Sequence, residues 1–353
     1  MTTTAGTTDP YTSTRTPDAW RIPRRAGELT GPRVRAALDG LSEPVRTVAR
    51  YHFGWCDAEG RPTDTGWGKG LRGALVLGGA EALGGTAGAA LPAAAAVELI
   101  HNFSVLHDDV MDQDLTRRGR PTAWTVFGSA QAVLAGDALL VLAMRELAAA
   151  PPPARCAVAV DELCRALLEL VTGQGSDLAF EERADVGPEE CLAMAAGKTG
   201  ALFAAACGLG ALSADGTAAQ VEALRSFGNH LGLAFQLVDD LLGIWGDSPT
   251  TGKPVGADLR RRKKSLPVVA ALSSGTPAGR RLAELYHDGR PMGTAEVARA
   301  TALIEKAGGR RWAVREAARQ QSLARERLAG AALDARAAQG LRSLVDLVTH
   351  RSS

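Results

Sequence analysis

Two clusters of aspartates stand near the ends of apolar segments of the sequence. The first, His107-Asp108-Asp109-Val110-Met111-Asp112, closes a segment that runs from Ala93 to His107. Residues four apart share one face of a helix, so Asp108 and Asp112 should project together, with Asp109 beside them. Carboxylates this close repel one another unless cations lie between them, and oxygen ligands favour Mg²⁺ completed by waters and substrate phosphates. Taken alone, the cluster reads equally well as a solvated acidic helix end.

The second cluster repeats this arrangement. In Phe235-Gln236-Leu237-Val238-Asp239-Asp240, paired aspartates again lie near the end of an apolar segment, Leu231 to Leu242. Two acidic clusters on two apolar helices are costly near a core unless metal ions or cationic side chains neutralise them. If they face each other across a cavity, they would hold a Mg²⁺–diphosphate complex.

Basic residues suited to phosphate follow both clusters. Arg117 and Arg118 lie in a Gly/Pro-bounded loop five residues after Asp112. One guanidinium group can donate two parallel hydrogen bonds to two phosphate oxygens. Lys198 and the run from Arg260 to Lys264 add further positive charge. Each of these features alone is usually solvated surface, but their combination favours a phosphate site.

Helical periodicity dominates the chain from Pro32 onward, and no segment shows the alternation of a convincing strand. Residues 1–27 are polar and rich in Thr and Pro, which predicts a disordered arm. Residues 28–353 are predicted to form one all-α domain of packed helices. The predicted helices cover residues 93–107, 129–149, 155–173, 188–211, 217–242 and 310–338.

Composition excludes several classes of protein. Hydrophobic residues make up 46% and charged residues 22%, as in globular proteins, and a net charge of +1 gives no field that would recruit nucleic acid. No uncharged apolar run reaches the roughly 18 residues of a membrane span. The five cysteines, odd in number and without metal-like pairing, indicate reduced core residues of a cytoplasmic protein.

The order of these motifs resembles the trans-isoprenyl diphosphate synthases, the polyprenyl synthetase family, over roughly residues 68–267. Nine segments in order make the resemblance specific. It implies an all-α barrel of antiparallel helices, usually a homodimer, with both aspartate motifs facing a deep central cavity. The matching segments are Gly68-Lys69-Gly70-Leu71-Arg72, Glu98 to Asp112, Arg117-Arg118-Gly119, Gly136 to Leu140, Gly173-Gln174 with Asp177, Lys198-Thr199, Phe235 to Asp240, Gly252-Lys253-Pro254 and Asp258 to Pro267.

The resemblance also implies a reaction. Three Mg²⁺ ions, held by Asp108, Asp112 and Asp239, would bind an allylic diphosphate and draw charge onto the leaving diphosphate. The double bond of isopentenyl diphosphate then attacks the allylic cation, and proton loss gives a chain five carbons longer. The implied catalytic residues are Asp108, Asp109, Asp112, Lys198, Asp239, Asp240 and Lys253. The implied substrate-binding residues are Arg117, Lys198, Thr199, Gln236, Lys253 and Lys263 for the allylic diphosphate, and Lys69, Arg72, His101 and Arg118 for isopentenyl diphosphate.

Phe103 and Ser104, five and four residues before the first aspartate, correspond to the cavity floor that limits product length in the family. A large residue followed by a small one, without an insertion inside the motif, resembles the geranylgeranyl (twenty-carbon) type. A farnesyl or longer-chain synthase is the alternative assignment. A terpene cyclase of the same fold would need an Asn-Ser-Glu metal triad, which residues 239–247 lack. A weakly active partner subunit would normally have lost an aspartate of the first motif.

Three residues depart from the family pattern. Gly70 stands where a second basic residue is common, Gly243 replaces the last aspartate of the second motif, and Arg262 replaces a glycine before the motif lysine. These departures bear on rate more than on reaction type, and Asp247 could partly replace the missing carboxylate.

The N-terminal arm has two interpretations. It is either an inert terminus or a recruitment tail that docks the enzyme to a pathway partner or compartment shell. In the second case, Tyr11 and the segment from Trp20 to Pro23 would be its apolar anchors.

Overall fold

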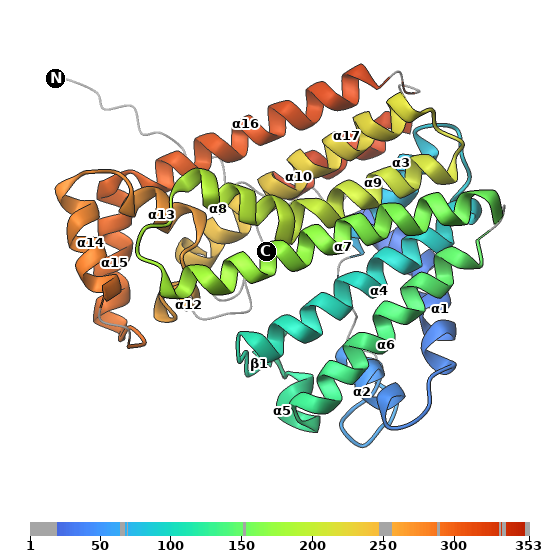
Figure 1. Ribbon diagram of the computed structural model, residues 1–353, viewed down its shortest axis with the longest axis horizontal. Helices are drawn as coiled ribbons and strands as arrows, with labels where there is room; N and C mark the ends of the chain where they lie inside the picture. The colour runs from blue at the N-terminus through green and yellow to red at the C-terminus, as the bar shows by residue number, and fades with distance from the viewer. Residues whose placement is uncertain are drawn as a thin grey trace.

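The computed structural model describes residues 20–63, 68, 70–150, 153–246, 256–287, 290–331, 333 and 337–349. Long, mostly antiparallel helices make up this part of the chain, so the all-α prediction is confirmed (Figure 1). The helices are α1 (Arg21–Asp39), α2 (Val45–His52), α3 (Leu71–Glu81), α4 (Ala87–Met111), α5 (Ala123–Phe127), α6 (Ser129–Ala148), α7 (Pro153–Glu182), α8 (Pro188–Ala195), the π-helix η1 (Ala196–Gly200), α9 (Ala201–Ser213), α10 (Ala218–Trp245), α12 (Ala257–Arg260), α13 (Leu266–Leu272), α14 (Pro277–His287), α15 (Thr294–Ala307), α16 (Gly309–Gly330) and α17 (Ala337–Thr349).

The only sheet in the described residues is a hairpin of two strands, β1 (Thr116–Arg117) and β2 (Arg120–Pro121). Arg118 and Gly119 connect the strands, and both have positive φ, at 53° and 73°. Two-residue hairpin loops favour this left-handed backbone because it matches the twist of the strands. The hairpin follows α4 directly and therefore lies next to the first aspartate motif (Figure 1).

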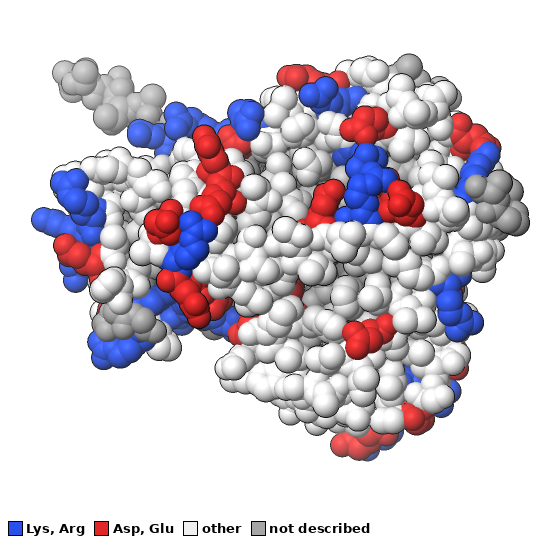
Figure 2. Space-filling view, in the orientation of Figure 1, with Lys and Arg blue, Asp and Glu red and all other residues white. Residues whose placement is uncertain are grey.

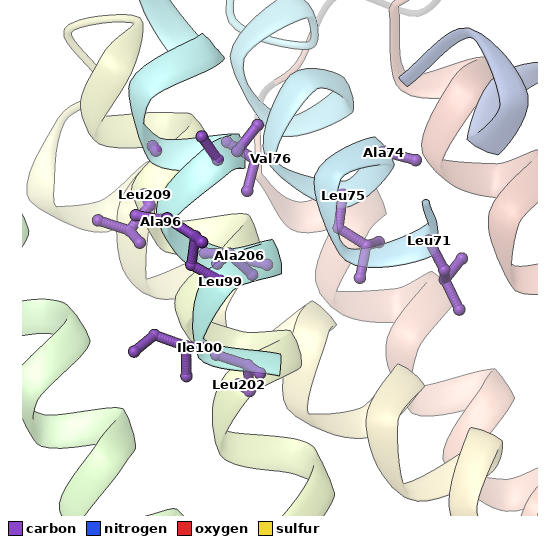
Figure 3. Packing of buried hydrophobic residues seen from close by; sticks show 14 of the residues in the cluster. Leu71, Ala74, Leu75, Val76, Ala96, Leu99, Ile100, Leu202, Ala206 and Leu209 are labelled. Atoms are coloured by element: carbon purple, nitrogen blue, oxygen red, sulfur yellow. The ribbon is translucent and has the colours of Figure 1, made fainter. Parts of the chain in front are cut away.

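The core beside the site is built by α3, α4 and α9, which pack side by side (Figure 3). Leu75, Leu99 and Leu209 come from the three helices in turn and are fully buried. Burying each leucine contributes about 2 kcal/mol. Alanines such as Ala96 and Ala206 lie between them and let the helix backbones approach closely. This packing fixes α4, and with it the aspartates at its end.

A second, smaller apolar cluster lies under α14 and α15 and includes Leu259, Val268, Leu282 and Ile304. These two helices lie at one end of the long bundle (Figure 1). The cluster holds α12 and the start of α13, and the short segment between those helices carries Lys263.

Helix ends agree with the predictions where local signals are strong. The helix α6 begins at the predicted Ser129, and Thr217 caps α10 in a capping box with Gln220, a pattern that fixes a helix start. The predicted helix 155–173 continues to Glu182. The predicted helix 310–338 is wrong as a single element, because α16 ends at Gly330 and α17 begins at Ala337.

The predicted arm extends too far into the chain. The helix α1 begins at Arg21, and Ala26, Thr30, Val34 and Leu38 are buried at helical spacing. Trp20 and Ile22, predicted as free anchors, are partly buried against the main core instead. The prediction of disorder is therefore wrong from Arg21 onward, because this segment buries an apolar face. Tyr11 and the rest of residues 1–19 lie outside the described residues.

Two helical segments, Ala87–Met111 and Pro188–Ser213, are long and apolar enough to cross a membrane. However, 72% and 67% of their most apolar windows are buried inside the fold, which is typical of core helices. The five cysteines are free thiols; Cys56, Cys191 and Cys207 are buried, while Cys156 and Cys164 are partly exposed.

Candidate functional site

The first aspartate motif lies at the C-terminal end of α4. Asp112 caps the helix, and its backbone N–H donates to the carbonyl of Asp108 at 2.8 Å. Burial raises the pKa of Asp108 to about 6; the nearby charge of Lys198 opposes this rise and that of Asp112 adds to it. The folded chain therefore holds a carboxylate that ionises less readily than usual, and a divalent cation beside it would restore ionisation.

Asp109 has a different environment from its two neighbours in the motif. It is buried, and its Oδ1 accepts a hydrogen bond of 2.6 Å from Nε of Arg117. Arg117 also donates to Asp114 at 3.3 Å. This ion-pair cluster ties the β1–β2 hairpin to the end of α4.

The π-helix η1 presents Lys198 and Thr199. Nζ of Lys198 donates to Oδ2 of Asp177 on α7 at 2.6 Å. Burial alone would raise the pKa of Asp177, but the charges of Lys263 and Lys198 lower it below its usual value. The Asp177 carboxylate is therefore held in its charged form, and its hydrogen bond with Lys198 joins α7 to η1.

The second aspartate motif lies on α10. Asp240 is buried; its Oδ1 accepts from Nε2 of Gln236 at 2.8 Å, and its Oδ2 accepts from the backbone N–H of Leu266 at 2.9 Å. Burial raises the pKa of Asp240 to about 7. The hydroxyl of Thr199 extends this hydrogen-bond network by donating to Oε1 of Gln236 at 2.7 Å. Asp239, the adjacent residue, is exposed.

Lys263 links the two motifs electrostatically. Burial would lower its pKa, yet the carboxylates of Asp177, Asp258, Asp240 and Asp112 raise it well above its usual value. These carboxylates come from α7, α12, α10 and the end of α4, so the structure brings both aspartate motifs around one ammonium group.

A second bridge crosses the same region. Arg261, which follows α12, forms an ion pair with Asp114, which follows α4. The segments after the two helices are therefore connected directly, next to the two aspartate motifs.

Within the residues that the structure describes, no group of three or more His, Cys, Asp or Glu side chains is placed to hold one metal ion. Mg²⁺ commonly takes only one or two carboxylates and completes its shell with waters and phosphates. The raised pKa of Asp108 beside Asp112 fits such a site.

Residues predicted to bind the second diphosphate also gather in one region. The guanidinium of Arg72 lies over the ring of Phe203, 5.0 Å from its centroid. Burial lowers the pKa of His101 well below its usual value, and the charges of Arg72 and Arg118 lower it further, so His101 is neutral at physiological pH. Lys69 and Lys253 lie outside the described residues.

Two of the three departures from the family pattern, Gly70 and Gly243, have a local structural cause. Gly70 has a φ of +63°, and a Cβ there would lie 2.7 Å from the carbonyl oxygen of Pro23 in α1, so no side chain fits. A Cβ on Gly243 would lie 2.3 Å from Oδ2 of Asp258, whose carboxylate occupies that space. Arg262 has a φ of +55°, a backbone conformation that favours the glycine usual at this position. Asp247 lies outside the described residues.

Phe103, the predicted floor residue, is buried on α4. Its ring meets that of His107 edge to face, with centroids 4.7 Å apart. His107 in turn lies 3.0 Å from the carbonyl oxygen of Val133 on α6. Ser104 donates to the carbonyl of His101 at 2.9 Å, a bond within its own helix. The floor position is therefore braced against α6 through His107.

Sequence reasoning assigned no role to several residues that complete this region. Asp177 and Asp258 lie within the recognised motifs, and this position could have indicated that they belong to the site. Arg261 is one of several basic residues in a row, and its sequence context does not distinguish it from its neighbours. A large cavity of about 860 Å³ lies elsewhere, between α7, α8–α9 and α10, and none of the predicted site residues lines it.

Comparisons with known proteins identify the family of this chain. The sequence profile of the polyprenyl synthetase family matches residues 63–304. A (2E,6E)-farnesyl diphosphate synthase of Mycobacterium tuberculosis is 46% identical over 99% of both chains, and a geranylgeranyl diphosphate synthase of the same species is 49% identical over 81% of both.

Solved structures share the fold. A polyprenyl synthetase from Streptomyces coelicolor superposes with a TM-score of 0.90 at 46% identity, covering 94% of this chain and 99% of that one. A geranylgeranyl pyrophosphate synthase from Corynebacterium glutamicum, complexed with isoprenyl diphosphate and magnesium, gives a TM-score of 0.81 at 25% identity, covering 95% of this chain and 100% of that one. The chain thus belongs to the polyprenyl synthetase family of trans-isoprenyl diphosphate synthases and is a prenyltransferase.

Proposed function

We propose that this chain condenses isopentenyl diphosphate with an allylic diphosphate, in the presence of Mg²⁺, to give a twenty-carbon (geranylgeranyl) diphosphate. The observation that carries the proposal is the convergence of both aspartate motifs on Lys263, with Lys198 beside Asp108. Carboxylates for metal ions and ammonium groups for phosphate oxygens are what a diphosphate leaving group requires.

The allylic diphosphate would be held between α4, η1 and α10. Asp108, Asp112 and Asp239 would hold the magnesium ions, three as in the family pattern. When bound, these ions act as Lewis acids that stabilise charge on the departing diphosphate. The direct protein contacts would come from Arg117, Lys198, Thr199, Gln236, Lys253 and Lys263. Fixed cations of this kind cost little reorganisation as negative charge develops.

Asp109 and Asp240 act through other residues in this proposal. The ion pair with Asp109 fixes the guanidinium of Arg117. Asp240 is anchored by Leu266 N–H and receives the amide of Gln236, which leaves Oε1 of Gln236 to accept from Thr199. Both aspartates are therefore proposed as positioning residues.

Isopentenyl diphosphate would bind beside this site, through Lys69, Arg72, His101 and Arg118. A neutral His101 can donate one ring N–H to a phosphate oxygen without adding charge next to the arginines. The double bond of isopentenyl diphosphate would then face the allylic carbon.

Product length is the finer part of the proposal. A single large side chain at the floor, Phe103, followed by the small Ser104, supports a twenty-carbon limit. The alternative is a farnesyl synthase, which is favoured by the relative of that name that matches over 99% of the chain.

The test is to incubate the protein with Mg²⁺, isopentenyl diphosphate and each allylic primer in turn, and to measure the chain length of the product. A twenty-carbon product is expected. A fifteen-carbon end product would establish the farnesyl alternative, and the absence of condensation with every primer would refute the proposed reaction.

We also propose that the chain forms a homodimer through the outer faces of α6 and α7. Leu134 and Val141 on α6 are 52% and 59% exposed, and Leu168 and Val171 on α7 are 70% and 58% exposed. Much of the surface around these helices is uncharged (Figure 2). Replacing Leu134 and Leu168 with Glu should shift the protein to a monomer in sedimentation experiments, and an unchanged mass would refute this interface.

Finally, five free thiols in a chain of this size support a reducing, cytoplasmic location. Residues 1–19 remain the candidate for a docking tail. A pull-down that compares the full chain with a variant starting at Trp20 tests this idea, since that truncation leaves α1 intact.

A further inference from the structure

Arg117, proposed above to contact the allylic diphosphate, is also bound to two carboxylates of its own chain. Its Nε donates to Oδ1 of Asp109 at 2.6 Å, and its Nη2 donates to Oδ2 of Asp114 at 3.3 Å. Burial would lower the pKa of Arg117, but the hydrogen bond and charge of Asp109 and the charge of Asp114 raise it above its usual value. A phosphate group must therefore compete with these carboxylates for the guanidinium of Arg117.

Asp114 is shared between two arginines. It is only 5% exposed, and its Oδ1 forms an ion pair with Arg261 while its Oδ2 accepts from Arg117. Its backbone carbonyl accepts from the hydroxyl of Thr122 at 2.7 Å and from the indole N–H of Trp124 at 2.8 Å, which fixes the main chain of Asp114. A buried carboxylate held in this way needs a cationic partner, because an uncompensated buried charge is strongly destabilising.

Arg261 reaches Asp114 from a distant part of the chain. It directly follows α12, stands two residues before Lys263, and belongs to a run of five basic residues, 260–264. The side chain of Arg261 is half exposed, and an arginine in such a run is ordinarily solvated. Its ion pair with a buried carboxylate beside the proposed diphosphate site therefore indicates a specific role.

The formal charges of these four side chains show what Arg261 supplies. Asp109 and Asp114 carry two negative charges. Arg117 and Arg261 carry two positive charges, so the group is neutral. Without Arg261, the group has a net charge of −1 beside the position proposed for an anionic diphosphate. Of the two arginines that pair with Asp114 in the described residues, only Arg117 then remains.

We propose that Arg261 is a positioning residue, whose ion pair with Asp114 neutralises that carboxylate and so leaves Arg117 available to the allylic diphosphate. This inference rests on the proposed function for the role of Arg117. Its own content is that the segment after α12 sets the phosphate affinity of an arginine in the β1–β2 hairpin, and that it does so through Asp114.

The experiment compares the wild-type protein with Arg261→Gln, Arg261→Lys, Asp114→Asn and the double variant Asp114→Asn/Arg261→Gln. Lysine keeps the positive charge at position 261. The double variant removes one charge of each sign, so the remaining pair of Asp109 and Arg117 is again neutral. Arg281→Gln is the matched control, because Arg281 is an exposed arginine on α14 and its replacement removes the same charge.

The measurements are calorimetric binding of inorganic pyrophosphate with Mg²⁺, KM for the allylic diphosphate, KM for isopentenyl diphosphate, and the melting temperature. For Arg261→Gln we expect the dissociation constant of pyrophosphate and the allylic KM to rise roughly fivefold, as for one uncompensated charge several ångströms from a ligand. KM for isopentenyl diphosphate should change by less than about twofold. Arg261→Lys should recover part of the loss, and Arg281→Gln should match wild type.

The double variant distinguishes this role from a structural one. If Arg261 acts by neutralising Asp114, the double variant should bind pyrophosphate within about twofold of wild type. Asp114→Asn alone should bind pyrophosphate at least as tightly as wild type. If Arg261 only held two segments of the chain together, the losses of the two substitutions would add.

An unchanged affinity for pyrophosphate in Arg261→Gln would overturn the proposal. So would a double variant that binds no better than Arg261→Gln, or an equal rise in both KM values together with a lower melting temperature. If the wild-type protein condenses isopentenyl diphosphate with no primer, the proposed function fails, and the pyrophosphate titrations decide this inference separately. A loss in Arg261→Gln that Asp114→Asn reverses supports it, whereas equal binding by all variants, or no binding by wild type, overturns it.

Discussion

Replacing Asp108 with Asn should make the protein more stable and much less active. The pKa of Asp108 rises from 3.8 to about 6 in the folded chain, mainly because the side chain is buried. A difference of about two pKa units corresponds to about 3 kcal/mol between the charged and neutral forms. Asn resembles the neutral form, so the free energy of unfolding of Asp108→Asn should exceed that of wild type by up to about 3 kcal/mol at pH 7.5 without Mg²⁺.

The pH dependence of this gain follows from the direction of the shift. A carboxyl whose folded pKa is raised penalises the folded state only where it ionises, so the penalty is absent well below pH 3.8, grows as pH rises, and is complete above about pH 6. The stability gain of Asp108→Asn should therefore shrink to about 1 kcal/mol at pH 4.5. For 353 residues, 3 kcal/mol corresponds to a rise in Tm of roughly 4 °C.

The assay is thermal or denaturant unfolding of wild type and Asp108→Asn at both pH values, with steady-state turnover measured in parallel. Turnover should fall by at least about a hundredfold, because a charged metal ligand is worth several kcal/mol. Asp161→Asn is the control, since Asp161 is an exposed carboxylate on α7 and its replacement should change stability by less than about 0.5 kcal/mol. An Asp108→Asn protein that is less stable than wild type at pH 7.5, or that turns over normally, would refute the reasoning.

Three further predictions follow from single sites. Phe103→Ala should cost about 3–5 kcal/mol of stability and lengthen the product, read by chromatography of the dephosphorylated alcohols; an unchanged product would place the floor elsewhere. Gly70→Lys, which restores the usual basic residue, should destabilise the fold by about 2–4 kcal/mol in denaturant titrations, because it adds a strained φ and a contact with Pro23. A stable variant with a lower KM for isopentenyl diphosphate would contradict this. Gly243→Ala should displace the carboxylate of Asp258 and lower stability by about 1–3 kcal/mol, and an unchanged midpoint would show that the carboxylate moves freely.

Local patterns were sufficient to predict most of the long core helices and to select most of the candidate site, because residue types and their spacing carry that information directly. They did not distinguish the two members of each aspartate pair. Adjacent residues on a helix point about 100° apart. Asp109 therefore meets the hairpin and Asp240 meets the start of α13, while Asp108 and Asp239 have different surroundings. Only the packing of distant segments decides which carboxylate meets which partner.

Contacts between residues far apart in the sequence were missed for the same reason. Pro23 restricts Gly70 across 47 residues of sequence, and Asp258 fills the space at Gly243 through a loop that no periodicity describes. The start of α1 was missed because its buried face is made largely of small residues such as Ala26, Thr30 and Gly31, which give little apolar signal. A helix whose buried face consists of small residues cannot be predicted from its own sequence pattern, because only its packing against other helices reveals that face.

The π-helix η1 has a consequence for how such a site could arise. A single wide turn accommodates one more residue than a regular helical turn, and such turns are frequent at functional sites. Because η1 absorbs the extra residue, α8 keeps Cys191 and Met194 in the core and α9 keeps Leu202 and Phe203 there. One added residue at this turn therefore changes the direction of Lys198 and Thr199 and leaves the packing on both sides unaltered. Deleting one residue within 196–200 would remove the wide turn, and would displace either the buried side chains of the flanking helices or the side chains of Lys198 and Thr199.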